Sequence, residues 1–154
     1  MTKLTITMLA TLTTLALTTG VALAGSEDVV VDDAWARASI GMNRPGAAYM
    51  TIRNIGDEAV TLTGISTPLA MMPEIHETTT SAAGVSSMAP AGEITIAPGE
   101  AAELAPGGLH AMLMQLQEQM IEGQSFPLTL NFSDGGNVTV EVPILGFAAR
   151  GPEG

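Results

Sequence analysis

Hydrophobic and polar residues alternate along short segments of this chain, and Gly, Pro, Asn and Asp separate the segments. Alternation with a period of two is typical of β-strands, whereas almost no stretch keeps helical spacing for three turns. The pattern predicts strands over residues 28–37, 47–54, 59–67, 74–80, 84–88, 93–96, 101–104, 109–116, 126–132 and 137–144.

The segments between these strands have turn composition. "NIGDE", "APGE", "APGG" and "SDGGN" contain Gly and Asn, which tolerate positive φ, and Pro, which fixes φ at the first turn position. Many short strands at such spacing indicate an all-β fold, a sandwich or a Greek-key barrel. Only residues 115–123, "QLQEQMIEG", are expected to form a helical turn or two, and the closing "AARGPEG" is expected to be loose.

The first residues have a different composition. Lys3 precedes an apolar, threonine-rich run that ends in "VALAG", as in a secretory signal peptide with small residues before the cleavage site. We expect residues 1–24 to be removed and residues 25–154 to form a single exported domain. A membrane anchor is the alternative, but the run falls short of the roughly 20 apolar residues that span a bilayer.

Charge and cysteine content narrow the function classes. The sequence has 16 Asp and Glu residues against five Lys and Arg residues. A surface of this charge is expected to repel nucleic acid and anionic lipid and to oppose self-association. We therefore expect a monomer that does not insert stably into a membrane. With no cysteine, the chain has no disulfide, thiol chemistry or blue-copper site, since that site requires a cysteine ligand.

Candidate chemistry is concentrated in two segments, "EIHETTTSAAGVSSM" and "GGLHAMLMQL", which hold both histidines and several methionines. Imidazole and thioether groups together favour Cu(I) and compete poorly for Mg²⁺ or Ca²⁺, which prefer oxygen ligands. No spacing suggests a Ser-His-Asp triad, and no Gly-rich phosphate loop precedes a helix, so we do not expect an enzyme.

Strand geometry predicts two half-sites. In the strand over 109–116, His110 and Met112 lie on one face with Cα atoms about 7 Å apart, close enough to share an ion. Met114 continues the alternation but lies about 13 Å from His110, so we predict that it packs in the core.

The second half-site depends on a hairpin between His76 and Met88. A loop of residues 81–83 places Met88 directly opposite His76, whereas a loop of residues 82–84 places it diagonally across on the same face. Either register allows a two-residue half-site, whereas a four-residue loop would break the match, and the sequence leaves the choice open.

These residues resemble the copper-binding signature of the periplasmic copper chaperone family called PCuAC. His76 is followed by 11 residues and Met88, then by 21 residues and His110-Ala111-Met112. The segments "AWAR", "RPGAAYMTIRNIGDEAVTLTGIST" and "IAPGEAAELAPGGLHAMLM" are also similar to the family, so the resemblance covers nearly all of residues 25–154.

The resemblance implies a cupredoxin-like β-sandwich that binds one Cu(I) per chain through His76, Met88, His110 and Met112. It implies a periplasmic chaperone that delivers copper to a respiratory oxidase, chiefly the dinuclear copper centre of cytochrome c oxidase, so the partner is a copper-accepting oxidase subunit or another copper chaperone. Many members have a methionine just after the first histidine, where this chain has Glu77 and Thr78, and "AARGPEG" lacks the His- and Met-rich tail of some members. A single copper site is therefore expected.

Two other functions stay open at this stage: a passive periplasmic copper buffer that confers resistance, and an exported β-sandwich that binds no metal. Met42, Met50, Met71, Met72 and Met120 are expected to be ordinary packing residues, with Met71 and Met72 at the rim of the site as the alternative. Trp35 and Tyr49 are expected to pack on the sheet.

Charged residues near these segments are given structural roles. Arg37, Arg44 and Arg53 are each expected to pair with a carboxylate, since basic residues are so few. Glu74 and Glu77 are expected to be solvated, with orientation of the His76 ring by one of them as the alternative.

Overall fold

The computed structural model describes residues 26–152, and the predicted signal peptide lies outside them. A short 3₁₀ helix, η1 (Ser26–Asp28), precedes ten strands. The strands are β1 (Val29–Arg37), β2 (Gly46–Asn54), β3 (Val60–Ser66), β4 (Ala70–Thr80), β5 (Ser86–Pro90), β6 (Ile94–Ile96), β7 (Ala101–Leu104), β8 (Leu109–Leu116), β9 (Ser125–Phe132) and β10 (Asn137–Leu145). Among the described residues, no helix is long and apolar enough to cross a membrane.

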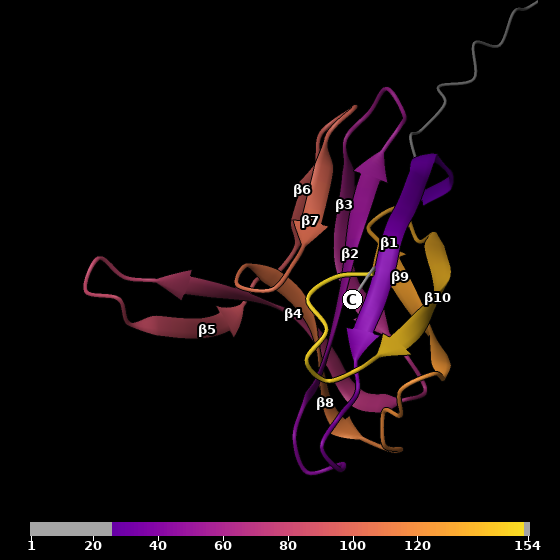
Figure 1. Cartoon of the computed structure of the whole chain (residues 1–154). Coiled ribbons are helices and arrows are strands. Elements are labelled where there is room, and N and C mark those ends of the chain that lie inside the picture. Colours follow the sequence, from indigo (N-terminus) through magenta and orange to yellow (C-terminus); the bar gives the residue numbers. More distant parts are fainter. Residues whose placement is uncertain (1–25, 153–154) are drawn as a thin grey trace, which may run out of the picture.

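The predicted all-β sandwich is confirmed. A first sheet has the order β5-β4-β8-β7-β2-β1, and a second has the order β10-β9-β3-β6. Parallel pairing of β1 with β10 joins the two into one continuous sheet that folds over on itself (Figure 1). The apolar sides of both sheets meet in a core that includes Ile52, Leu62, Leu113, Leu128 and Val142.

The burial pattern follows from strand alternation, with one irregularity in β1. Between Asp32 and Trp35 the pairing with β2 shifts by one residue, and Asp33 adopts a φ of 51°. An extra residue in one strand reverses which side chains face the core. Val29 therefore faces the core before the bulge and Ala36 after it, while Trp35 is turned onto the outer face of the first sheet, where it stacks on Tyr49 with ring centroids 4.6 Å apart. Trp35 and Tyr49 thus pack on the sheet, as expected.

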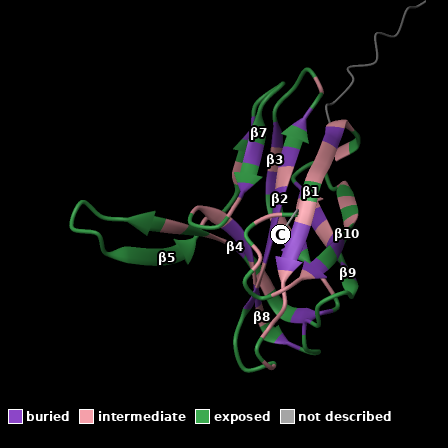
Figure 2. Cartoon of the chain, viewed as in Figure 1, coloured by how far each residue is buried: buried purple, intermediate pink, exposed green. Residues whose placement is uncertain are grey.

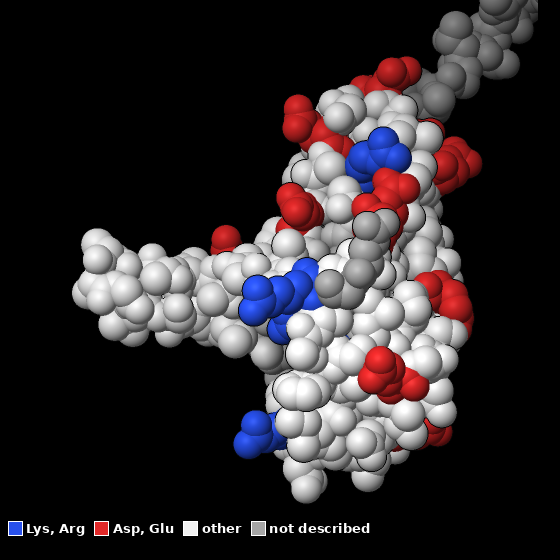
Figure 3. Space-filling model, viewed as in Figure 1, with Lys and Arg blue, Asp and Glu red and all other residues white. Residues whose placement is uncertain are grey.

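The β4–β5 hairpin projects from the sandwich as an arm (Figure 1). We use "arm" for residues 77–90. Every residue of β5 is exposed (Figure 2), and beyond Glu77 the arm carries no charged side chain (Figure 3). The structure extends β4 back to Ala70, beyond the predicted start at Glu74, and β5 lies two residues later than predicted. "AMMP" shows no alternation of hydrophobic and polar residues and ends in proline, so the pattern gave no strand signal there.

Two expectations about irregular segments are wrong. Residues 117–123 form bends and a turn, without a helix. Their backbone is held by the loop after β1 instead: the Ser39 amide donates to the Met120 carbonyl at 2.9 Å, and the Ser39 hydroxyl accepts from the Met120 amide at 3.0 Å. The fully buried Met120 side chain anchors the segment.

The C-terminal segment was expected to be loose, but as far as Pro152 it is not. Residues 146–152 fold back over the first sheet (Figure 1). Arg37 holds this segment: its Nε donates to the Ala149 carbonyl at 2.7 Å, and its guanidinium lies 5.7 Å from the Trp35 ring centroid. The expectation that Arg37 pairs with a carboxylate is therefore wrong. For Arg53 it is confirmed, by an ion pair with Asp32 at 2.7 Å.

Candidate metal site

Antiparallel pairing of β4 with β8 assembles the site from two distant parts of the chain. His76 lies opposite His110, Glu74 opposite Met112, and Met72 opposite Met114. Residues directly opposite in an antiparallel pair point to the same face. Between these positions, Ile75 of β4 and Ala111 and Leu113 of β8 are buried in the core. The paired histidines and methionines therefore lie together on the outer face of the first sheet.

The two imidazoles are adjacent but not hydrogen-bonded to each other. Their ring centroids lie 6.2 Å apart, with an edge-to-face angle of 78°. His110 is 5% exposed, and the His76 side chain is 12% exposed. Such burial limits the competition of water for their nitrogen atoms.

A backbone contact sets the tautomer of His110. Its Nδ1 lies 3.1 Å from the carbonyl oxygen of Gly108. Because a carbonyl only accepts, Nδ1 carries the proton, and the Nε2 lone pair of the neutral ring is available as a ligand. This is the usual arrangement of a metal-binding histidine, with one nitrogen donating to the protein.

His76 is oriented by a carboxylate. Its Nε2 lies 3.1 Å from Oε2 of Glu74, so Nε2–H donates to the carboxylate and Nδ1 of the neutral ring holds the lone pair. Nδ1 is buried and has no hydrogen-bond partner among the described residues. A buried lone pair without a donor is unfavourable unless an electrophile occupies that place, so this atom fits a metal ion. The alternative expected for Glu74, orientation of the His76 ring, is thus observed.

The two predicted methionines differ in their positions. Met112 neighbours His110 along β8, is partly buried, and lies diagonally from His76. Met88 pairs with Thr78 and lies diagonally from His76 on the arm, in the register expected from a loop of residues 82–84. Met88 is 59% exposed. Its partner Thr78 and the partner of Met112, Glu74, are four residues apart on β4, which corresponds to about 13 Å along the strand. His76, His110 and Met112 therefore form a compact group, and Met88 lies at its outer edge.

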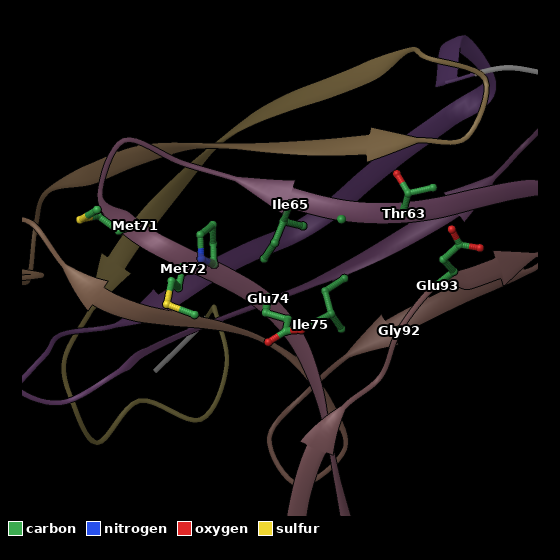
Figure 4. Close-up of a pocket in the computed structure, with 10 residues that line it drawn as sticks. Thr63, Ile65, Met71, Met72, Glu74, Ile75, Gly92 and Glu93 are labelled. Atoms are coloured by element: carbon green, nitrogen blue, oxygen red, sulfur yellow. The ribbon is translucent and has the colours of Figure 1, made fainter.

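Expectations for the other methionines are corrected in part. Met114 does not pack in the core: it is partly exposed and lies on the outer face with Met112. Met42, Met71 and Met72 are also exposed, so only Met50 and Met120 of the methionines expected to pack are buried. Met71 and Met72 line an open depression of about 440 Å³ next to Glu74 (Figure 4), but neither histidine lines it, so a place for these methionines at the rim of the site stays a prediction. No group of three His, Asp or Glu side chains suited to a metal occurs in residues 26–152.

Comparison with known proteins places the chain in a family. The profile described as "LpqE-like: Putative lipoprotein LpqE-like" matches residues 29–144. This chain belongs to the LpqE-like family. A relative, "Putative lipoprotein Lxx21020" of Leifsonia xyli subsp. xyli, is 33% identical over 124 residues, which is 80% of this chain and 73% of the relative.

Solved structures show the same fold as this LpqE-like chain. The apo PCuAC domain of PmoF2 is 22% identical, with a TM-score of 0.64 over 80% of this chain and 94% of that domain. Its copper-bound form is 21% identical, with a TM-score of 0.63 over 77% of this chain and 93% of that domain. The solution structure of CuI-DR1885 from Deinococcus radiodurans is 35% identical, with a TM-score of 0.57 over 75% of this chain and 76% of that protein. The resemblance to PCuAC is therefore confirmed in the fold.

Proposed function

We propose that this LpqE-like protein is an exported chaperone that binds one Cu(I) through His76, Met88, His110 and Met112 and passes it to an acceptor protein. Nδ1 of His76, which is buried and has no hydrogen-bond partner within residues 26–152, carries this proposal. Together with Nε2 of His110 and the Met112 thioether, it supplies neutral nitrogen and sulfur donors on one sheet face, the donor set that Cu(I) prefers. The copper-bound relatives, PmoF2 and CuI-DR1885, support the choice of metal.

The arrangement suits transfer rather than catalysis. Neutral ligands need no deprotonation to bind and no protonation to leave, so an acceptor can replace them one at a time. Met88 is the natural first ligand to exchange, because it stands exposed on the uncharged arm while both histidines are nearly covered. We expect the imidazoles to hold the ion while Met88 opens the site to the partner.

The cellular role proposed for this transfer follows the sequence resemblance. Residues 1–24 act as a signal peptide, residues 25–154 form a single periplasmic domain, and the acceptor is a copper site of a respiratory oxidase, chiefly the dinuclear copper centre of cytochrome c oxidase. The names of the family and of the Leifsonia relative, which describe lipoproteins, are consistent with export.

The ligand set is tested by Cu(I) titration of residues 25–154 under anaerobic, reducing conditions against a chromophoric competitor. We expect one tight equivalent, lost in Met112→Leu and retained in Met71→Leu, an exposed methionine on β4 outside the proposed set. Circular dichroism checks that both variants fold. Equal binding by Met112→Leu and the wild type would contradict the proposed ligands.

Delivery is tested separately in cells. Deletion of the gene is expected to lower cytochrome c oxidase activity under copper limitation, with recovery from the wild type but not from Met112→Leu. Unchanged oxidase activity together with increased copper sensitivity would instead identify a passive copper buffer.

A further inference from the structure

Three thioethers lie together beside the histidine pair, on the side away from the arm. Met72 is paired with Met114 across β4 and β8, and Met112 is two residues from Met114 on the same face. Opposite residues in such a pair have Cβ atoms roughly 5 Å apart, and neighbouring rows are about 7 Å apart. The three sulfur atoms can therefore converge on one ion. We call Met72, Met112 and Met114 the thioether cluster.

These side chains are accessible from solvent. Met72 is 50% exposed, and Met112 and Met114 are partly exposed, in contrast to Met50 and Met120, which are buried in the core. Methionine usually fills gaps in cores, so a cluster of three on an outer face has no packing explanation. Figure 4 shows the thioether of Met72 pointing away from that of Met71, beside the open depression.

A polar contact holds the Met72 thioether. Gln115 adopts a φ of 55°, a left-handed conformation that non-glycine residues rarely adopt, and its Nε2 donates to Sδ of Met72 at 3.0 Å. Strained backbone of this kind persists where the surrounding structure enforces it, often at binding sites. A thioether sulfur has two lone pairs, so this hydrogen bond leaves one for a metal ion.

We propose that the thioether cluster is a second, weaker Cu(I) site, through which the ion passes to or from the histidine pair. Three neutral thioethers select a soft monovalent cation over hard ions. Met112 belongs to both sites, so the ion can move one row along β8 by exchanging the sulfur atoms of Met72 and Met114 for the nitrogen atoms of His76 and His110. No change of oxidation state is required. The direction of passage rests on the proposed chaperone function, whereas the existence of the second site does not.

The test is a Cu(I) titration of residues 25–154 labelled with ¹³C at the methionine methyl groups, followed by NMR under anaerobic, reducing conditions. The first equivalent is expected to shift Met88 and Met112, and the second to shift Met72 and Met114. The buried Met50 and Met120 are internal references, because neither reaches the outer face. A Met72→Leu/Met114→Leu variant is expected to lose the second equivalent and keep the first.

The matched control is Met71→Leu. Met71 neighbours Met72 on β4 and is 69% exposed, but alternation turns it away from the outer face. This variant is expected to keep both equivalents. Absence of a second equivalent, or its persistence in Met72→Leu/Met114→Leu, would overturn the second site. If the first equivalent leaves the methyl signals of Met88 and Met112 unshifted, the proposed chaperone site is contradicted instead. In that case, a shift of the Met72 and Met114 signals would still support the thioether cluster.

Discussion

The rings of His76 and His110 lie directly opposite each other on β4 and β8, with centroids 6.2 Å apart. More than thirty residues separate them in the sequence, and the pairing of the two strands brings them together. The register of that pairing is fixed from the other side of the sheet, where Ile75 and Ala111 are buried in the core. A slip of one residue would expose these core residues and separate the two imidazoles.

Replacement of His76 by leucine is expected to stabilise the metal-free protein while abolishing tight Cu(I) binding. Nδ1 of His76 is buried and has no hydrogen-bond partner in the part of the chain that the structure describes, and such a group costs about 1–3 kcal/mol. We expect the free energy of unfolding of the apo variant to rise by about 1 kcal/mol, measured by urea denaturation in the presence of a Cu(I) chelator. A less stable apo variant would show that Nδ1 has a favourable partner in solution.

Glu74 is expected to tune the affinity of the site through His76. Its carboxylate accepts the Nε2 proton at 3.1 Å, and loss of such a contact typically lowers metal affinity about 10-fold to 100-fold. Glu74→Ala should therefore weaken Cu(I) binding at least about tenfold, and Glu74→Gln, which keeps an acceptor, should weaken it less. Glu77→Gln is the control, because Glu77 is exposed on the opposite face of β4. Equal effects of Glu74→Ala and Glu77→Gln would indicate a general charge effect.

Gly46 is expected to be intolerant of a side chain. A Cβ at this position would overlap Sδ of Met120 and lie 3.6 Å from Cβ of Leu113. Overpacking of a core typically costs about 1–3 kcal/mol, so Gly46→Ala should lower the free energy of unfolding by that amount. Gly64→Ala is the control, since a Cβ there meets nothing within 4 Å, and its effect should stay within about 0.5 kcal/mol. Equal stabilities of the two variants in urea denaturation would contradict the proposed overlap.

Asp134 is expected to make a small, pH-dependent contribution to stability. Hydrogen bonds from the amides of Gly136 and Ser26, both 2.9 Å long, lower the pKa of this carboxyl below its ordinary value of 3.8. Because the folded-state pKa is lowered, the stabilisation is present above the ordinary pKa and is lost as the pH falls through the lowered pKa.

Asp134→Asn should therefore be less stable than the wild type at pH 7, by less than about 1 kcal/mol since the site is exposed. The difference should shrink as the pH falls below 3.8. Urea denaturation over a pH series checks this, and a difference that stays constant with pH would exclude the charge as its cause.

Much of the fold could be predicted from the sequence, because strand alternation reports which face of a strand is buried. The placement of His110 and Met112 on one face is local to one strand, so alternation was sufficient to predict it. The same alternation places Met114 on the outer face, and its assignment to the core was wrong because it relied on distance from His110 alone.

The rest depends on contacts between distant segments. The opposition of His76 and His110 comes from the β4–β8 register, which local spacing does not reveal. The hairpin register depended on which residues form the loop, 81–83 or 82–84, and the turn residues were compatible with both. Residues 117–123 do not form a helix because their hydrogen bonds go to the loop at Ser39, a partner that no local pattern indicates.

The two faces of β8 carry different residues, so the sequence of one face can change during evolution without changing the other. Ala111 and Leu113 hold the strand in the core, and His110 and Met112 stand on the opposite side. A mutation that changes a donor atom therefore leaves the hydrophobic contacts of the fold in place. For the proposed copper site, metal preference and affinity can therefore change by natural selection while the sandwich is inherited unchanged.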